Sequence, residues 1–120
     1  MNYRPLSSVE IEEEVWRISQ KLDHQVGVVA TRARAAAEAE VAYKLAHAKA
    51  ILRVEGATVA ERDAKALLEC ASEYALYKGA DAVLLAAQEA GRSLRAQIDA
   101  LRTLSAAQRA ALVNAEGVGA

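Results

Sequence analysis

The chain has 120 residues, with 15 basic and 16 acidic side chains and a formal net charge of −1. This balance argues against a field that draws the whole molecule to DNA or to an anionic membrane, so any nucleic-acid surface has to be local. Alanine supplies 29 residues, phenylalanine is absent and proline occurs once, a composition that favours long helices. We expect an all-α chain with a single helical domain over residues 1–120.

The first helix has a strong start signal. Residues 1–6 are predicted to be an arm, because Ser7 with Glu10 three residues later forms a capping box. Residues 8–54 contain no proline, and Gly27 is their only glycine. The simplest prediction is one helix over about residues 8–54, with a bend or a break at Gly27 left open.

An apolar stripe runs along this first helix at a spacing close to the 3.6 residues per turn of a straight helix, which favours bundle packing without a strong supercoil. Its members, which we expect to form the buried seam, are Ile11, Val15, Ile18, Leu22, Val26, Val29, Ala33, Ala37, Val41, Leu45, Ala48 and Leu52.

The stretch 53–61 carries both stop and restart signals. Gly56 stands where a helix C-cap favours a left-handed residue, and Thr58 with Glu61 forms a second capping box. A connection of two to four residues makes the next helix antiparallel. We therefore predict a long antiparallel helical hairpin with its second helix over about 59–103.

The second helix carries apolar residues at alternating intervals of three and four, from Leu67 to Leu101. If it breaks, we expect the break at Gly79. Ser105 with Gln108 three residues later forms a weaker capping box, which predicts a short C-terminal helix through Val113. Residues 114–120 are expected to be a frayed tail.

Folding at positions 56 and 57 pairs residues whose numbers sum to about 113. This register places Tyr74 and Tyr77 against the alanine-rich stretch 33–39, large against small. It also brings the basic C-terminal part of the second helix toward an acidic first turn, whose members are Glu10, Glu12, Glu13 and Glu14.

An arginine face is the best candidate for binding phosphates, because arginine suits phosphate geometry. Its members are Arg92, Arg95, Arg102 and Arg109. The alternative is that these arginines pair with the acidic first turn or are solvated beside the seam. Interleaved aromatic residues, which single-strand binders use for stacking, are missing there, so nucleic acid is possible but not favoured.

Signals for catalysis, cofactors or metal binding are weak. Cys70 lies in an apolar helical pattern, typical of a small core residue, and the register places it near Tyr43 rather than beside a histidine. His24 and His47 have no Glu or His three or four residues away. Paired carboxylates need a pocket that shifts their pKa values, which two helices do not offer. We expect no enzyme, cofactor or metal site.

Self-association is predicted because an alanine-rich stripe buries little area and further apolar residues widen the apolar face. The predicted protein-interaction residues are Val9, Trp16, Ile51, Leu68, Val83 and Leu85. Trp16 is either a binding hot spot or closes the end of the helical core against Leu101 or Leu104. We favour a dimer of hairpins forming a helical bundle. A compact monomer, folded back at Gly27 and Gly79, is the alternative.

Several segments resemble a group of small helical proteins from tailed bacteriophages of actinobacteria. They are the run AEVAYKLAHAKA at 39–50, Arg53, Glu55-Gly56, ERDAKA at 61–66, RSLR at 92–95 and LRTL at 101–104. The resemblance covers roughly residues 35–110. It implies an early, non-virion gene product, and it carries over no site residues.

We therefore predict a non-enzymatic phage accessory protein that binds a protein partner, in phage DNA metabolism or host takeover. The alternatives are a nucleic-acid-binding module that uses the arginine face and a structural virion component. The first residues lack the apolar core of a signal peptide and no apolar run approaches the ~18 residues of a membrane span, so the expected location is the host cytoplasm, without membrane association.

Overall fold

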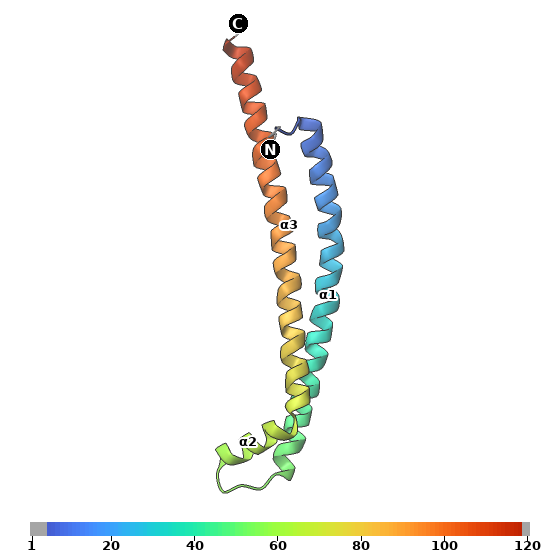
Figure 1. Ribbon diagram of the computed structural model, residues 1–120, viewed down its shortest axis with the longest axis vertical. Helices are drawn as coiled ribbons and strands as arrows, with labels where there is room; N and C mark the ends of the chain where they lie inside the picture. The colour runs from blue at the N-terminus through green and yellow to red at the C-terminus, as the bar shows by residue number, and fades with distance from the viewer. Residues whose placement is uncertain (1–4, 119–120) are drawn as a thin grey trace. The chain divides into compact units, whose positions relative to one another are not determined.

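A computed structural model of the chain describes residues 5–118. Helix α1 spans Ser8–Arg53, α2 spans Val59–Glu69 and α3 spans Ala71–Val118, and the described residues include no strand (Figure 1). The expected all-α class is confirmed. The first four residues of the predicted arm and the last two of the predicted tail lie outside the described residues.

The chain divides into two compact units. Unit 1 comprises Met1–Val26 and Glu89–Ala120, and unit 2 comprises Gly27–Gln88. Both α1 and α3 contribute to each unit, whereas α2 belongs to unit 2 alone.

Both predicted capping boxes start helices. At the start of α1, the Ser7 hydroxyl accepts from the Glu10 amide at 3.2 Å and the Ser7 amide donates to the Glu10 carboxylate at 3.4 Å. At the start of α2, the Thr58 hydroxyl accepts from the Glu61 amide at 3.1 Å. These contacts satisfy amides that have no partner within the helix.

Unit 1 is built around isoleucines. Ile11, Ile18 and Ile98 are at most 5% exposed. At the end of this unit the Gln108 side-chain amide donates to the Leu6 carbonyl at 2.6 Å, across 102 residues of sequence. The hydrogen bond ties the chain just before α1 to the later part of α3.

Unit 2 has a core of small side chains. The buried residues there are Ala36, Ala50, Ala66, Cys70 and Ala87. Small residues let helix backbones approach closely, but each buries little apolar area. The large side chains of this unit, apart from the half-buried Tyr43 and Tyr77, are mostly exposed.

The second half of the chain breaks at Cys70 instead of forming one helix over 59–103. Cys70 has φ −107° and ψ 27°, and both its amide and its thiol donate to the Ala66 carbonyl, at 3.2 and 3.0 Å. Figure 1 shows α2 leaving the line of α3 at this point. The break contains no glycine or proline. We attribute it to the packing of Ala66 and Cys70, which are both buried.

Two further expectations for this half were wrong. Gly79 lies inside α3, where an added Cβ would meet nothing within 4 Å, so neighbouring helix formers outweigh its low propensity. No separate C-terminal helix starts at Ser105, because α3 continues to Val118 and includes residues 114–118 of the predicted tail. Gln108, the expected partner of that cap, instead bonds to Leu6. Gly27 likewise lies inside α1.

The seam of α1 was predicted correctly only in its first turns. From residue 26 onward the expected seam residues are exposed, apart from the half-buried Val29: Val26, Ala33, Ala37, Val41, Leu45, Ala48 and Leu52. The buried or half-buried positions there include Ala36, Tyr43 and Ala50, spaced seven residues apart. Alanine occupies both faces of this helix, so apolar periodicity alone does not distinguish them.

The register of unit 2 also differs from the prediction. Tyr77 packs on Tyr43 rather than on the alanine stretch 33–39, and Arg53 pairs with Glu69 at 2.8 Å. Later residues of α1 thus meet earlier residues of the following chain, as in an antiparallel pair. A simple turn at 56–57 would place Tyr77 opposite position 36 of α1. Because α2 leaves the helix line, Tyr77 instead lies against Tyr43, about two helical turns nearer the C-terminal end of α1.

Candidate interaction surfaces

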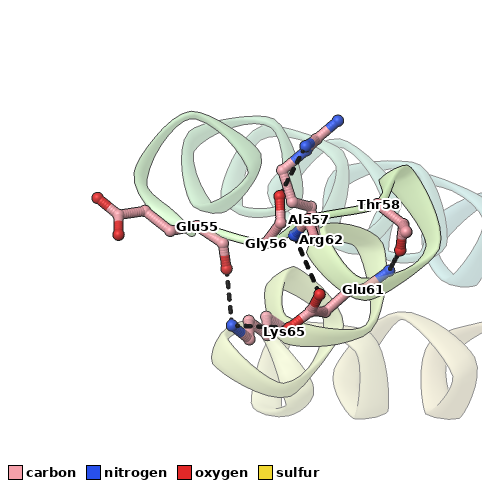
Figure 2. A network of polar contacts seen from close by, with 7 residues as sticks. All are labelled: Glu55, Gly56, Ala57, Thr58, Glu61, Arg62 and Lys65. Atoms are coloured by element: carbon pink, nitrogen blue, oxygen red, sulfur yellow. Dashed lines mark hydrogen bonds and ion pairs between the residues drawn. The ribbon is translucent and has the colours of Figure 1, made fainter.

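The connection between α1 and α2 is a closed hydrogen-bond network (Figure 2). The Arg62 guanidinium donates to the Gly56 carbonyl at 2.9 Å, and the Lys65 ammonium donates to the Glu55 carbonyl at 2.7 Å. The Glu61 carboxylate accepts from the Ala57 amide at 3.0 Å and lies 3.4 Å from Lys65. The Ala57 amide, followed by Lys65, holds the pKa of Glu61 below its ordinary value.

Gly56 serves this network by its size, not by a left-handed backbone. No described glycine has a positive φ, so the predicted left-handed cap is wrong. A Cβ at Gly56 would stand 3.1 Å from the Arg62 Cγ and 3.3 Å from the Arg62 amide nitrogen. The polar groups of the connection between α1 and α2 therefore bond to one another, and we assign this connection a structural role.

An aromatic cluster joins α1 and α3 within unit 2. The Tyr43 ring stacks on Tyr77 with a centroid distance of 5.6 Å and meets Tyr74 edge-on at 5.2 Å. His47 lies 5.8 Å from Tyr43, and the Lys78 ammonium lies 5.0 Å from the Tyr77 ring centre. The rings and the lysine contact one another, so this cluster mainly fixes the register of unit 2.

An open groove of about 450 Å³ lies beside Cys70, with Ala46, Ala50 and Lys49 on its α1 side. The Cys70 side chain is 2% exposed and its thiol donates to a carbonyl. The burial of Cys70 agrees with its prediction as a small core residue.

His24 is exposed and lines a separate groove of unit 1 with Arg17 and Lys21.

The arginine face of unit 1 lies in α3, and all four of its members are exposed. Arg92 pairs with Glu89 one turn earlier. Among the described residues no ion pair is found for Arg95, Arg102 or Arg109, which follow each other at intervals of seven residues. The predicted pairing with the acidic first turn is therefore not seen for these three.

Two further ion pairs join residues within one turn of α1. Glu14 binds Arg17 three residues later, and this hydrogen bond lowers the pKa of Glu14 and raises that of Arg17. Lys44 lies 2.8 Å from Glu40, and this contact raises the pKa of Lys44. All these side chains are substantially exposed, so each pair contributes little to stability.

Five of the six predicted interaction residues are exposed. Trp16 is 67% exposed and Val9, two turns earlier on the same side of α1, is 60% exposed. The alternative that Trp16 closes the helical core is therefore wrong. Leu68, Val83 and Leu85 are exposed as well, whereas Ile51 is half-buried.

Sequence reasoning missed a second apolar surface on α1. Val41, Leu45 and Leu52 were expected in the seam, yet they are 56%, 57% and 87% exposed. These residues do recur at helical spacing, but they lie on the exposed side of α1 and not on its buried side. The signal that distinguishes the two sides was Tyr43, the only aromatic side chain between Trp16 and Tyr74.

Comparisons with protein-family models, curated proteins and solved structures find no match to this chain. Within the described residues, no helix combines the length and the apolar character that a membrane span requires. No three His, Cys, Asp or Glu side chains gather there in an arrangement that could hold a metal ion.

Proposed function

We propose that this chain is a non-enzymatic helical interaction protein, a long antiparallel hairpin that self-associates into a bundle and binds a protein partner. The observation that carries the proposal is the exposure of large apolar side chains in both units, above all Trp16 in unit 1 and Leu45 and Leu52 in unit 2. Burying such a side chain is worth roughly 1.5–3 kcal/mol. Contiguous exposed apolar surface on a folded chain is typical of interaction sites.

The buried residues support the same proposal. The core of unit 2 consists largely of alanines and one cysteine, which contribute little apolar burial. Larger side chains that would ordinarily supply that burial, such as Leu76 at 69% exposure, lie on the surface instead. A bundle with further helices, in the manner of coiled-coil or four-helix packing, would cover them.

The surface around Trp16 is our candidate for the protein partner. Trp16 and Val9 lie on one side of α1 in unit 1, both more than half exposed. Tryptophan is enriched at binding hot spots because it supplies a large rigid contact area. The residues between them include the exposed Glu12 and Glu13, so a partner with an apolar pocket and a basic rim would be complementary.

A tagged chain and its Trp16→Ser variant, purified from the same cells with and without nuclease, test this proposal. We expect one or more proteins that survive nuclease treatment with the wild type and are lost with the variant. Far-ultraviolet circular dichroism controls for folding, which an exposed side chain should not affect. Equal recovery with both chains, or no protein above background, would contradict the proposal.

The resemblance to actinobacteriophage proteins supports an accessory role in the host cytoplasm, in phage DNA metabolism or host takeover. A structural role in the virion is the alternative on the same resemblance. Mass spectrometry distinguishes them, because an accessory protein is found in infected cells and not in purified particles.

A nucleic-acid-binding module is the second candidate function, favoured by the three exposed arginines of α3 that make no ion pair with a described residue. Arg95 and Arg109 are separated by roughly 21 Å along a helix, a span that follows several phosphates. If this face binds single-stranded DNA, the affinity should fall steeply with salt, and Arg102→Ala should reduce the salt dependence. Affinity that ignores both changes would exclude this function.

A further inference from the structure

Helix α1 has a second apolar stripe within unit 2, here called the outer stripe. Its members recur every three or four residues, as required for one side of a helix, and all are exposed: Ala30, Ala33, Ala37, Val41, Leu45, Ala48 and Leu52. It extends over 22 residue steps, roughly 33 Å of helix. Leu52, at 87% exposure, is the most exposed large apolar side chain of the described residues.

Most of the outer stripe lies on the side of α1 opposite its buried residues, and Leu45 stands at the edge of the stripe, where it also lines the groove beside Cys70. Leu45 and Leu52 each follow a buried or half-buried residue, Tyr43 and Ala50, by two positions. Two positions correspond to about 200° around a helix of 3.6 residues per turn. Packing within unit 2 therefore leaves the stripe exposed.

The outer stripe is ordered by size. Its first part offers only alanine, at positions 30, 33 and 37, and its second part carries Val41, Leu45 and Leu52. In an antiparallel pairing of two such stripes about an axis at Val41, Leu45 meets Ala37 and Leu52 meets Ala30 of the other copy. Each of these leucines then packs on an alanine, and Val41 meets Val41 of the other copy at the axis. Such a contact is self-complementary, as a twofold dimer requires.

We propose that the outer stripe is the interface with a second copy of this chain, paired antiparallel with its twofold axis near Val41. This inference rests on the self-association proposed above and specifies its surface and direction. It places α1 of one copy directly against α1 of the other.

One charged side chain lies within the outer stripe. Arg34 lies on the stripe itself and would face Ala48 of the second copy, where the small side chain leaves room for its aliphatic stem.

The size of the contact predicts a modest affinity. A strip roughly 33 Å long and about 10 Å wide, the diameter of one helix, is smaller than the ~800 Å² per partner of a standard stable interface. We expect a dissociation constant in the micromolar range, so the dimer should form and dissociate with concentration.

Single cysteines at Val41 and at Leu52, reacted with a short bismaleimide crosslinker, test the interface. Cys70 remains in place because it is 2% exposed, and the wild-type chain is the control for its reactivity. Val41→Cys should crosslink into dimers, since its two copies meet at the axis. Leu52→Cys should not, because its two copies lie roughly 33 Å apart. Leu52 is the more exposed of the two, 87% against 56%, so random collisions would favour the opposite result.

A matched pair of charge substitutions provides a second readout. Leu45 and Leu112 are similarly exposed, at 57% and 61%, but only Leu45 belongs to the outer stripe. Leu45→Glu should raise the dimer dissociation constant at least about tenfold, and Leu112→Glu should leave it unchanged. A dimer that crosslinks as well through Leu52→Cys, or that is weakened equally by both glutamates, would overturn the interface while self-association stands. A mass of 12.8 kDa at every concentration would overturn both.

Discussion

Tyr43 of α1 stacks on Tyr77 of α3, with ring centroids 5.6 Å apart and an interplanar angle of 18°. Together with the edge-on packing of Tyr74 on Tyr43, this contact fixes the register of unit 2, because the buried residues of this unit are small. We expect Tyr77→Ala to destabilise the chain by about 2 kcal/mol, through lost burial and lost ring stacking. Tyr77→Phe keeps the ring and should stay within about 0.5 kcal/mol of the wild type. Urea unfolding followed by circular dichroism measures both, and equal losses for the two variants would contradict a stacking role.

Gly79 weakens α3 without a structural need. It lies in the helix interior, and an added Cβ would meet nothing within 4 Å. Gly79→Ala should therefore stabilise the chain by roughly 0.5–1 kcal/mol. Gly56→Ala should destabilise it, because its Cβ would stand 3.3 Å from the Arg62 backbone nitrogen. Thermal unfolding separates the two, and a destabilising Gly79→Ala would argue for the kink that α3 does not show.

The small-residue core around Cys70 predicts that stability responds differently when each of two alanines of α2 is enlarged. Ala66 is fully buried, whereas Ala64 is exposed. Ala66→Leu overpacks the small-residue core of unit 2 and should cost about 1–3 kcal/mol. Ala64→Leu adds the same side chain on the outside and should change stability by less than about 0.5 kcal/mol. Similar unfolding midpoints for the two variants would show that unit 2 is not tightly packed there.

The hydrogen bond from the Ala57 amide to Glu61 makes the start of α2 sensitive to acid. It lowers the pKa of Glu61 from its ordinary value of 4.5. A carboxylate with a lowered pKa in the folded state contributes stability that is present above the unfolded pKa and is lost as the pH falls through the folded one. The Ala57 amide proton, followed by nuclear magnetic resonance, should titrate with a midpoint below 4.5. Glu61→Gln should abolish this titration, and a midpoint at or above the ordinary value would contradict the bond.

Much of the fold could be predicted from short-range chemistry. Ser7 with Glu10 and Thr58 with Glu61 identified two helix starts, because a hydroxyl and a carboxylate at that spacing satisfy free amides. The break at Cys70 could not be predicted in this way, since its cause is tertiary packing of Ala66 and Cys70 and not a residue that disfavours helix. One missed break then shifted the pairing of α3 with α1.

The candidate interaction surfaces, like the fold, could be predicted only in part from the sequence. Exposure of Leu68 agrees with its position off the predicted stripe. Exposure of Trp16 could not be predicted, because the sequence was equally compatible with Trp16 closing the helical core against Leu101 or Leu104. The outer stripe itself was assigned to the wrong side, because alanine is compatible with burial and with exposure, and both sides of α1 carry it. Only the long-range contact of Tyr43 with Tyr77 decides between them.

The mass of the chain in solution, measured by light scattering over a range of concentrations, tests self-association through the outer stripe most directly. We expect the wild type to rise from 12.8 kDa toward twice that value at concentrations above roughly 10–100 μM. Leu45→Glu should remain at the lower mass over the same range, and Leu112→Glu should behave as the wild type. A wild-type chain that stays at 12.8 kDa throughout would contradict self-association.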